Sequence, residues 1–226
     1  MMGRSFEFLI LRQLLTDYFP ALLEGASNTL ILASCSWVIG VLVGVFLGFA
    51  ISERKEWMTF FDGAGFVIST IPVLVLLFWF HYPLQFMANV VVDPMITSIA
   101  IFSTLNAVFV ANTVAKTSRE IAKDYREAAF VNGMSHRVMR RKVEIPLVLR
   151  TSSPSIISYQ VVVLHMTLFA SLISANELFR TAQRINSIEY QPVEIYSLLV
   201  IFYAAISAPL LVASRYFRSS NDRWQQ

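Results

Sequence analysis

The chain contains five long stretches without a single Asp, Glu, Lys or Arg residue, and these stretches restrict its fold most severely. They cover more than half of the sequence: residues 25–52, 63–92, 94–115, 151–176 and 195–214. Each is long enough to cross the hydrocarbon core of a bilayer as a helix, which takes roughly 20 residues. Transmembrane strands alternate in polarity over about 10 residues, and these stretches do not. The sequence therefore predicts an all-α membrane protein in which the whole chain, 1–226, forms one transmembrane domain.

The composition agrees with a chain that lies largely in lipid. Hydrophobic residues make up 56% of the sequence and charged residues 15%, and the mean hydropathy is +0.59. A soluble domain usually contains about 25% charged residues, so the low charge argues against a soluble enzyme. We expect five transmembrane helices, over about 25–52, 59–82, 94–115, 152–176 and 194–214.

The positive charges indicate how the chain is oriented. If the loops 52–57, 116–150 and 215–226 lie on one side, that side holds 14 of the 18 Lys and Arg residues. Because cytoplasmic loops carry the excess of positive charge, we expect the N-terminus outside and the C-terminus in the cytoplasm. Residues 1–20 carry apolar side chains at helical spacing and are predicted to form an amphipathic arm in the outer interface.

Two patterns within the spans indicate how the helices pack. Gly40, Gly44 and Gly48 recur at every fourth residue and predict a smooth ridge that a second helix can approach closely. This ridge suits either a contact with another subunit or packing within the chain, and the sequence does not decide between them. Pro72 interrupts the second apolar run, where it is expected to kink the helix.

The sequence offers no recognisable catalytic or metal site. It contains no G-x-x-x-x-G-K-[ST] phosphate loop, no H-E-x-x-H or C-x-x-C motif and no G-x-S-x-G elbow. Its histidines, His81, His136 and His165, are too scattered to predict a metal cluster. A conduit or carrier subunit that draws its energy from elsewhere is therefore favoured over a membrane enzyme.

The loop 116–150 is the longest predicted segment outside the spans, and it mixes nine basic residues with four acids. Helix formers lead up to Gly133, which is expected to end a helix, and Ser135 is placed to cap a second one. We expect two short helices joined at the glycine, projecting under the bilayer and able to enter a groove on a partner. The alternative is a basic surface helix that rests on anionic lipid.

Residues 127–146 read EAAFVNGMSHRVMRRKVEIP, and this stretch resembles the EAA loop of binding-protein-dependent ABC importers, E-A-A-x3-G-x9-I-x-L-P. Val143 stands in place of Ile and Ile145 in place of Leu. The remaining defined positions match as Glu127, Ala128, Ala129, Gly133 and Pro146. Two later stretches, 171–187 and 193–207, are similar to the last two spans of the polar amino-acid permeases, the histidine, arginine, glutamine and opine group. The resemblance covers roughly residues 20–218.

The resemblance implies the permease subunit of a type I ABC importer of polar amino acids or their derivatives, in a bacterial inner membrane. Its implied partners are two cytoplasmic ATPase subunits that hold ATP and Mg, a second permease subunit and an extracytoplasmic solute-binding protein. No cofactor is expected in this chain. The residues of this chain that are implied to dock onto the ATPase are Glu127, Ala128, Ala129, Gly133, Ser135 and Arg137. The competing class is an ATP-independent channel or membrane scaffold whose basic loop only anchors to lipid.

The chain departs from the family where many members carry charges inside the membrane. An acid and an arginine of the third span fall at Asn112 and Ala115 here, and a charged stretch of the fourth span reads His165–Phe169. Intramembrane charges are usually functional. We therefore expect a heterodimer whose partner supplies most substrate-binding charges, with a homodimer for a less charged substrate as the alternative.

Four polar residues remain as candidates for the substrate pathway: Asn112, His165, Thr167 and Glu177. Three of them have a simpler interpretation. Asn112 suits a hydrogen bond between helices, His165 suits a core histidine, and Glu177 suits an acid on the surface of an outer loop.

Overall fold

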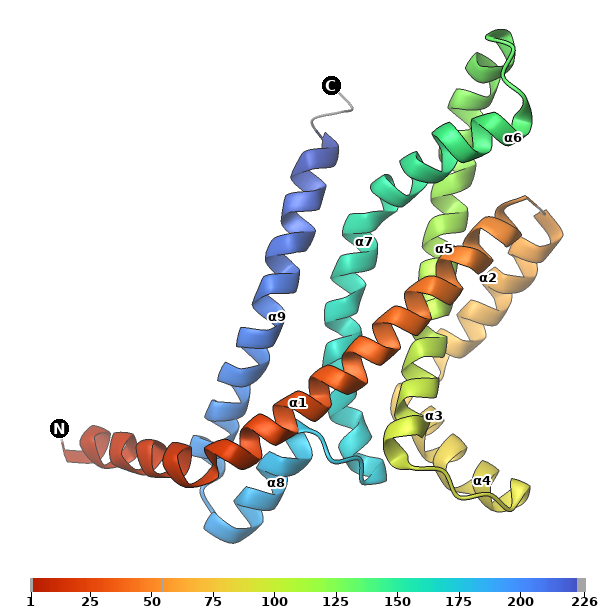
Figure 1. The fold of residues 1–226 in the computed structure, drawn as a ribbon. Coiled ribbons are helices and arrows are strands. Elements are labelled where there is room, and N and C mark those ends of the chain that lie inside the picture. The colour runs from red at the N-terminus through yellow and green to blue at the C-terminus, as the bar shows by residue number, and fades with distance from the viewer. Residues whose placement is uncertain (1, 54, 223–226) are drawn as a thin grey trace. The chain divides into compact units, whose positions relative to one another are not determined.

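The computed structural model describes residues 2–53 and 55–222, and within these ranges the side chains of 2–15, 126–130 and several others are not described. All regular secondary structure in these residues is helical. In chain order the elements are α1 (Met2–Ser52), α2 (Lys55–Thr70), α3 (Val73–His81), α4 (Pro83–Ala88), α5 (Pro94–Val131), α6 (His136–Met139), the π-helix η1 (Arg140–Glu144), α7 (Ile145–Met166), the 3₁₀-helix η2 (Thr167–Ile173), α8 (Leu178–Glu189) and α9 (Pro192–Asp222) (Figure 1).

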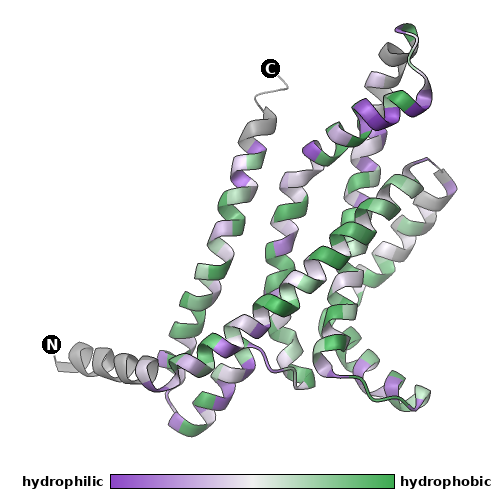
Figure 2. Cartoon of the chain, viewed as in Figure 1, coloured by the Kyte–Doolittle hydropathy of each residue, from purple (hydrophilic) through white to green (hydrophobic). Residues whose placement is uncertain are grey.

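Four helical segments are long and apolar enough to cross a membrane. They run over Thr16–Ser52, Pro94–Ile121, His136–Ile173 and Pro192–Arg218. Figure 2 shows hydrophobic residues along the middle of α1, whereas hydrophilic residues gather on α6 and the residues after it. The all-α prediction is therefore confirmed for the described residues, and the four segments have the length and composition of a multi-pass membrane protein.

The second predicted span, 59–82, does not form one helix. Helix α2 ends at Thr70 and α3 begins at Val73, because Pro72 has no backbone N–H and also disfavours the helical conformation at Ile71. A shorter apolar helical stretch follows over Val73–Ala88. Pro72 was expected to kink one helix, but it separates two helices, α2 and α3.

The predicted amphipathic arm, 1–20, continues into the first span without a break, since α1 runs from Met2 to Ser52 with Pro20 inside it. The amphipathic face of that arm lies mostly on side chains outside the described ones. The first of the two short helices expected in the loop 116–150 is the end of α5, which runs on to Val131.

Tertiary contacts divide the chain into two compact units. The first comprises residues 1–35, 73–101 and 163–209, and its core joins α1, α8 and α9. The buried core residues are Leu22, Ala26, Leu178, Ala182, Ile185, Ile195, Leu198, Leu199 and Tyr203. In the same unit α3 packs against η2, and Leu77 of α3 is fully buried.

The second unit comprises residues 36–72, 102–162 and 210–226, and the glycine ridge of α1 organises it. A Cβ atom on Gly40, Gly44 or Gly48 would lie 2.6–2.7 Å from the side chains of Asn106, Val110 and Val114 respectively. Each of these α5 residues is buried, and they recur at the same spacing as the glycines. The ridge therefore serves close packing within the chain, one of its two alternative interpretations.

A buried pair of amides links α5 to α7 beside this ridge. The Nδ2 of Asn106 donates to Oε1 of Gln160 (3.0 Å) and to the carbonyl of Ser36 (3.2 Å). The Nε2 of Gln160 donates to the carbonyl of Ile156 (2.9 Å). Since hydrogen bonds between membrane helices contribute about 0.6–2 kcal/mol, this pair fixes the register of the helices as well as satisfying its own polar atoms.

The ridge yields a prediction about stability. In Gly44→Val the new Cβ would lie 2.6 Å from Cβ of Val110 and 2.8 Å from the carbonyl oxygen of Ala107. Overpacking of this kind costs about 1–3 kcal/mol, so we expect a lower Tm of the detergent-solubilised protein. Gly63→Val is the matched control, because no atom lies within 4 Å of a Cβ at Gly63. An equal fall in Tm for both variants would contradict the packing role of the ridge.

Candidate functional site

The segment after α5 leaves the helix through a backbone turn that only glycine adopts freely. Gly133 has φ +70°, in the left-handed region, and no atom lies within 4 Å of the place where a Cβ would stand. The glycine is therefore required by the backbone conformation and not by a close neighbour. The expected helix stop at Gly133 agrees with this geometry.

The residues that follow are exposed until Met139. Ser135 occupies the N-cap position of α6 with an extended ψ of 149°, but its side chain makes no capping hydrogen bond. Its backbone carbonyl accepts from the N–H of Met139 (3.0 Å). The position of the predicted cap is thus correct, while the predicted role of its hydroxyl is not. Met139 is 2% exposed and anchors the end of α6.

The exposed surface of this segment combines apolar and basic side chains. Val131, Met134 and Val138 are 86%, 44% and 41% exposed, and Arg137 is exposed beside them. Glu127, Ala128 and Ala129 belong to the last turns of α5, and their side chains lie outside the described ones. An apolar surface with charges around it suits contact with another protein.

Three of the four predicted pathway residues gather around Tyr203 of α9, within the first unit. The Tyr203 hydroxyl donates to Oε2 of Glu177 (3.2 Å), and the His165 ring lies with its centroid 6.4 Å from that of Tyr203. Thr167 is fully buried, and its hydroxyl donates to the carbonyl of Leu164 (2.7 Å). Tyr203 was not predicted from the sequence, where the only indication of a role was its hydroxyl group within an apolar run.

Glu177 is a buried helix cap, so the simpler interpretation of it as a surface acid was wrong. Its side chain is 0% exposed and accepts from the backbone N–H groups of Phe179 (2.8 Å) and Arg180 (2.7 Å) at the start of α8. Burial raises the pKa of Glu177 to about 7, although these two N–H groups act in the opposite direction. The Glu177 carboxyl group thus titrates near neutral pH while it accepts hydrogen bonds from two backbone N–H groups and from the Tyr203 hydroxyl.

His165 is exposed, so it is not the core histidine of the simpler interpretation. Its Nε2 lies 3.3 Å from Oγ of Ser207, and the Ser207 hydroxyl itself donates to the carbonyl of Tyr203 (2.6 Å). The serine proton is therefore engaged, which leaves the histidine nitrogen as the donor in this pair.

Asn112 belongs to the second unit, where it lies half-buried on α5. Its Nδ2 would lie 2.9 Å from a Cβ on Gly65 of α2, so the amide occupies the space that the glycine leaves free. Ala115, one turn further along α5, is fully buried. The place of Asn112 suits contact between two helices, as the simpler interpretation has it.

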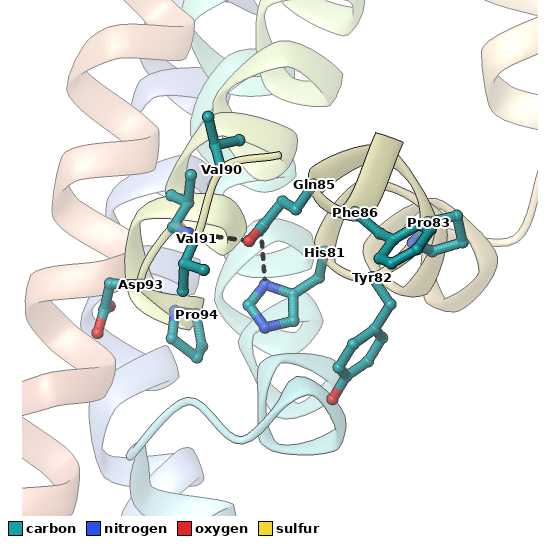
Figure 3. Close-up of a pocket in the computed structure, with 10 residues that line it drawn as sticks. His81, Tyr82, Pro83, Gln85, Phe86, Val90, Val91, Asp93 and Pro94 are labelled. Carbon is teal, nitrogen blue, oxygen red and sulfur yellow. Dashed lines mark hydrogen bonds between the residues drawn. The ribbon is translucent and has the colours of Figure 1, made fainter. Parts of the chain in front are cut away.

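A pocket that the sequence did not reveal lies in the first unit, where α3, α4 and the following loop meet (Figure 3). It measures about 800 Å³ and is lined by His81, Tyr82, Pro83, Gln85, Phe86, Val90, Val91, Val92, Asp93 and Pro94. Gln85 orders the pocket: its Oε1 accepts from the N–H of Val92 (2.9 Å), and its Nε2 lies 3.1 Å from Nδ1 of His81. Exposed Phe86 and Val91 make the rim apolar.

Within the described part of the chain, no group of three or more His, Cys, Asp or Glu residues could hold a metal ion.

Comparison with known proteins finds a matching family and several similar permeases. Residues 14–223 match the family described as binding-protein-dependent transport system inner membrane component. The chain is 27% identical to the histidine/lysine/arginine/ornithine permease HisQ of Salmonella typhimurium, over 79% of this chain and 83% of that protein. It is 26% identical to the glutamine permease GlnP of Escherichia coli K12 (84% and 88%) and to the glutamate/aspartate permease GltK of E. coli O6:H1 (86% and 91%).

Solved structures share the fold. An amino acid ABC transporter crystallised with histidines matches with a TM-score of 0.81 at 23% identity, covering 91% of this chain and 96% of that one. The inward-facing methionine transporter MetNI matches with a TM-score of 0.69 at 19% identity, covering 89% and 96%. At these identities the likeness concerns the fold alone.

Glu177 yields a prediction about pH. Its pKa is about 7 in the folded protein against 4.5 ordinarily, so between these values the folded state binds more protons than the unfolded state. Stability should therefore fall as pH rises from about 4.5 to about 7. Glu177→Gln removes this titration, and we expect its Tm to vary less between pH 5 and pH 8. Glu56→Gln, at an exposed acid of α2, is the control; an unchanged pH slope in Glu177→Gln would contradict the assignment.

Proposed function

The chain belongs to the family of binding-protein-dependent transport system inner membrane components, and we propose that it is the permease subunit of an ATP-driven importer of polar amino acids or their derivatives. The match over residues 14–223 carries this proposal. The relatives are permease subunits that work with separate ATPase subunits. This chain is accordingly a transmembrane permease and not an enzyme.

The substrate class rests on the relatives. HisQ, GlnP and GltK belong to systems for histidine, lysine, arginine and ornithine, for glutamine, and for glutamate and aspartate respectively. These substrates differ in side-chain charge but share the α-amino and α-carboxyl groups. A solute-binding protein outside the membrane would select among them and deliver the amino acid to the permease.

The proposed topology has five crossings in a bacterial inner membrane, with the N-terminus outside. The four long apolar helical segments supply four crossings. The broken stretch Lys55–His81, comprising α2 and α3, supplies the remaining one. Broken helices are tolerated in transporters where the freed backbone groups lie against protein or a water-filled cavity.

The coupling segment is proposed as Glu127, Ala128 and Ala129 at the end of α5 together with Gly133, Ser135 and Arg137. It would dock into one of two cytoplasmic ATPase subunits, which hold ATP and Mg. The exposed apolar and basic side chains at Val131, Met134 and Arg137 support a protein contact. Closure of the ATPase dimer can drive transport only by favouring one state of the pore over another.

The pathway residues proposed are Asn112, His165, Thr167 and Glu177, with the partner permease supplying further charges. In support, Ala115 is fully buried, and the hydrogen bonds of Thr167 and Glu177 are satisfied within the chain. Glu177 is the one acid among the four proposed residues, and a pore half with so few substrate charges favours a heterodimer over a homodimer.

Gly133→Val tests the coupling segment. A β-branched residue at φ +70° is strained, with a cost of roughly 1–2 kcal/mol in the left-handed region. We expect the variant to insert normally but to lose most ATPase co-purification and amino-acid uptake. Gly63→Val serves again as the control. Wild-type co-purification and uptake in Gly133→Val would favour a loop that rests on lipid instead.

Reconstitution tests the heterodimer. We expect uptake into proteoliposomes to require a second, different permease polypeptide in addition to this chain, the ATPase and the binding protein. The measurement is uptake of radiolabelled amino acid with and without that second polypeptide. Uptake at the full rate with this permease as the sole pore subunit would show a homodimer.

A further inference from the structure

Arg140 joins the segment after α6 to the end of α1. It is the first residue of the π-helix η1, directly after α6. Its NH2 group donates to the carbonyl of Phe49 (3.2 Å), and its NH1 group forms an ion pair with Glu53. One guanidinium therefore holds a carbonyl in the last turn of α1 and the first residue beyond that helix.

The end of α1 is a suitable anchor because its last carbonyls have no partner within the helix. Ser52 Oγ also donates to the Phe49 carbonyl (2.9 Å), and Nε of Arg119 donates to the Ser52 carbonyl (3.2 Å). Two positive side chains thus meet the negative end of the helix dipole. The first span is held at this end by α5 and by η1 together.

The other end of η1 is fixed to α5. Glu144 is 4% exposed, and its Oε1 accepts from the hydroxyl of Ser118 (2.7 Å). A five-residue π-helix between α6 and α7 is itself unusual, since π-helical turns are rare and concentrate at functional sites. The segment 140–144 is therefore tied at its first residue to α1 and at its last residue to α5.

We infer that Arg140 is a positioning residue for coupling: its bonds to Phe49 and Glu53 transmit movement of the α6 segment to the first membrane span. This inference rests on the proposed function, because it takes α6 to follow the ATPase. Through Arg140, the exposed α6 segment and the inner end of α1 move together. Movement of the docked segment therefore also displaces the glycine ridge of α1.

The neighbouring base Arg141 offers a matched control. It lies in the same π-helix and carries the same charge, but its side chain is exposed and makes no described contact with α1. A difference between Arg140→Gln and Arg141→Gln thus reports the contacts and not the charge of the segment. Glu53→Gln removes the ion pair alone and leaves the bond to the Phe49 carbonyl.

The experiment uses the complete transporter in proteoliposomes and measures ATPase co-purification, ATP hydrolysis and amino-acid uptake. In Arg140→Gln we expect normal co-purification, continued hydrolysis and about a tenfold fall in amino acid transported per ATP, as for loss of one charge-assisted hydrogen bond. Glu53→Gln should lower the same ratio by about twofold to threefold, since an exposed ion pair contributes less. The exchange Arg140→Glu with Glu53→Arg should recover part of the ratio lost in Arg140→Glu.

An unchanged ratio in Arg140→Gln, or an equal fall in Arg141→Gln, would overturn the inference. If Arg140→Gln does not insert, Glu53→Gln decides: a lowered ratio with normal co-purification supports the inference, and a wild-type ratio refutes it. Loss of co-purification in either variant would make the contact part of docking and refute a role in transmission. If the wild-type chain itself binds no ATPase, the proposed function fails and not the pairing of Arg140.

Discussion

A backbone N–H or carbonyl group in hydrocarbon has no water to bond, and this constraint governs the whole chain. A helix pairs these groups within its own segment, so the apolar stretches are expected to be helical. Every described residue with positive φ, namely Asn89, Gly133, Ser174 and Tyr190, lies outside the four long apolar segments, at or just beyond the end of a helix.

Polar side chains also satisfy the exposed backbone groups at two helix ends. The start of α8 is capped by the buried carboxyl group of Glu177, and the end of α1 is capped by Arg119 and Arg140. In each case a charge of the appropriate sign meets the end of a helix dipole. The same residues connect separate helices, so that capping and tertiary packing are achieved by one set of contacts.

For a transporter this arrangement has a mechanical consequence. Tight packing such as that of Gly44 against Val110 makes the helices move as bodies, because close-packed interiors resist gradual deformation. Movement must then enter through the few joints at helix ends. The exposed α6 segment with η1 behind it is one such joint, and the broken stretch at Pro72 is another place where the backbone departs from a continuous helix.

The sequence by itself determined the helical membrane class, four of the long apolar segments, the interruption at Pro72 and the turn at Gly133. These follow from local properties: missing charges, a missing N–H and a backbone conformation that favours glycine. The tertiary structure decided which surface covers the glycine ridge, that Glu177 is buried against Tyr203, and that Arg140 reaches back to Phe49 and Glu53. These contacts join residues far apart in the chain. Their formation depends on how whole helices pack, which no local pattern of residues specifies.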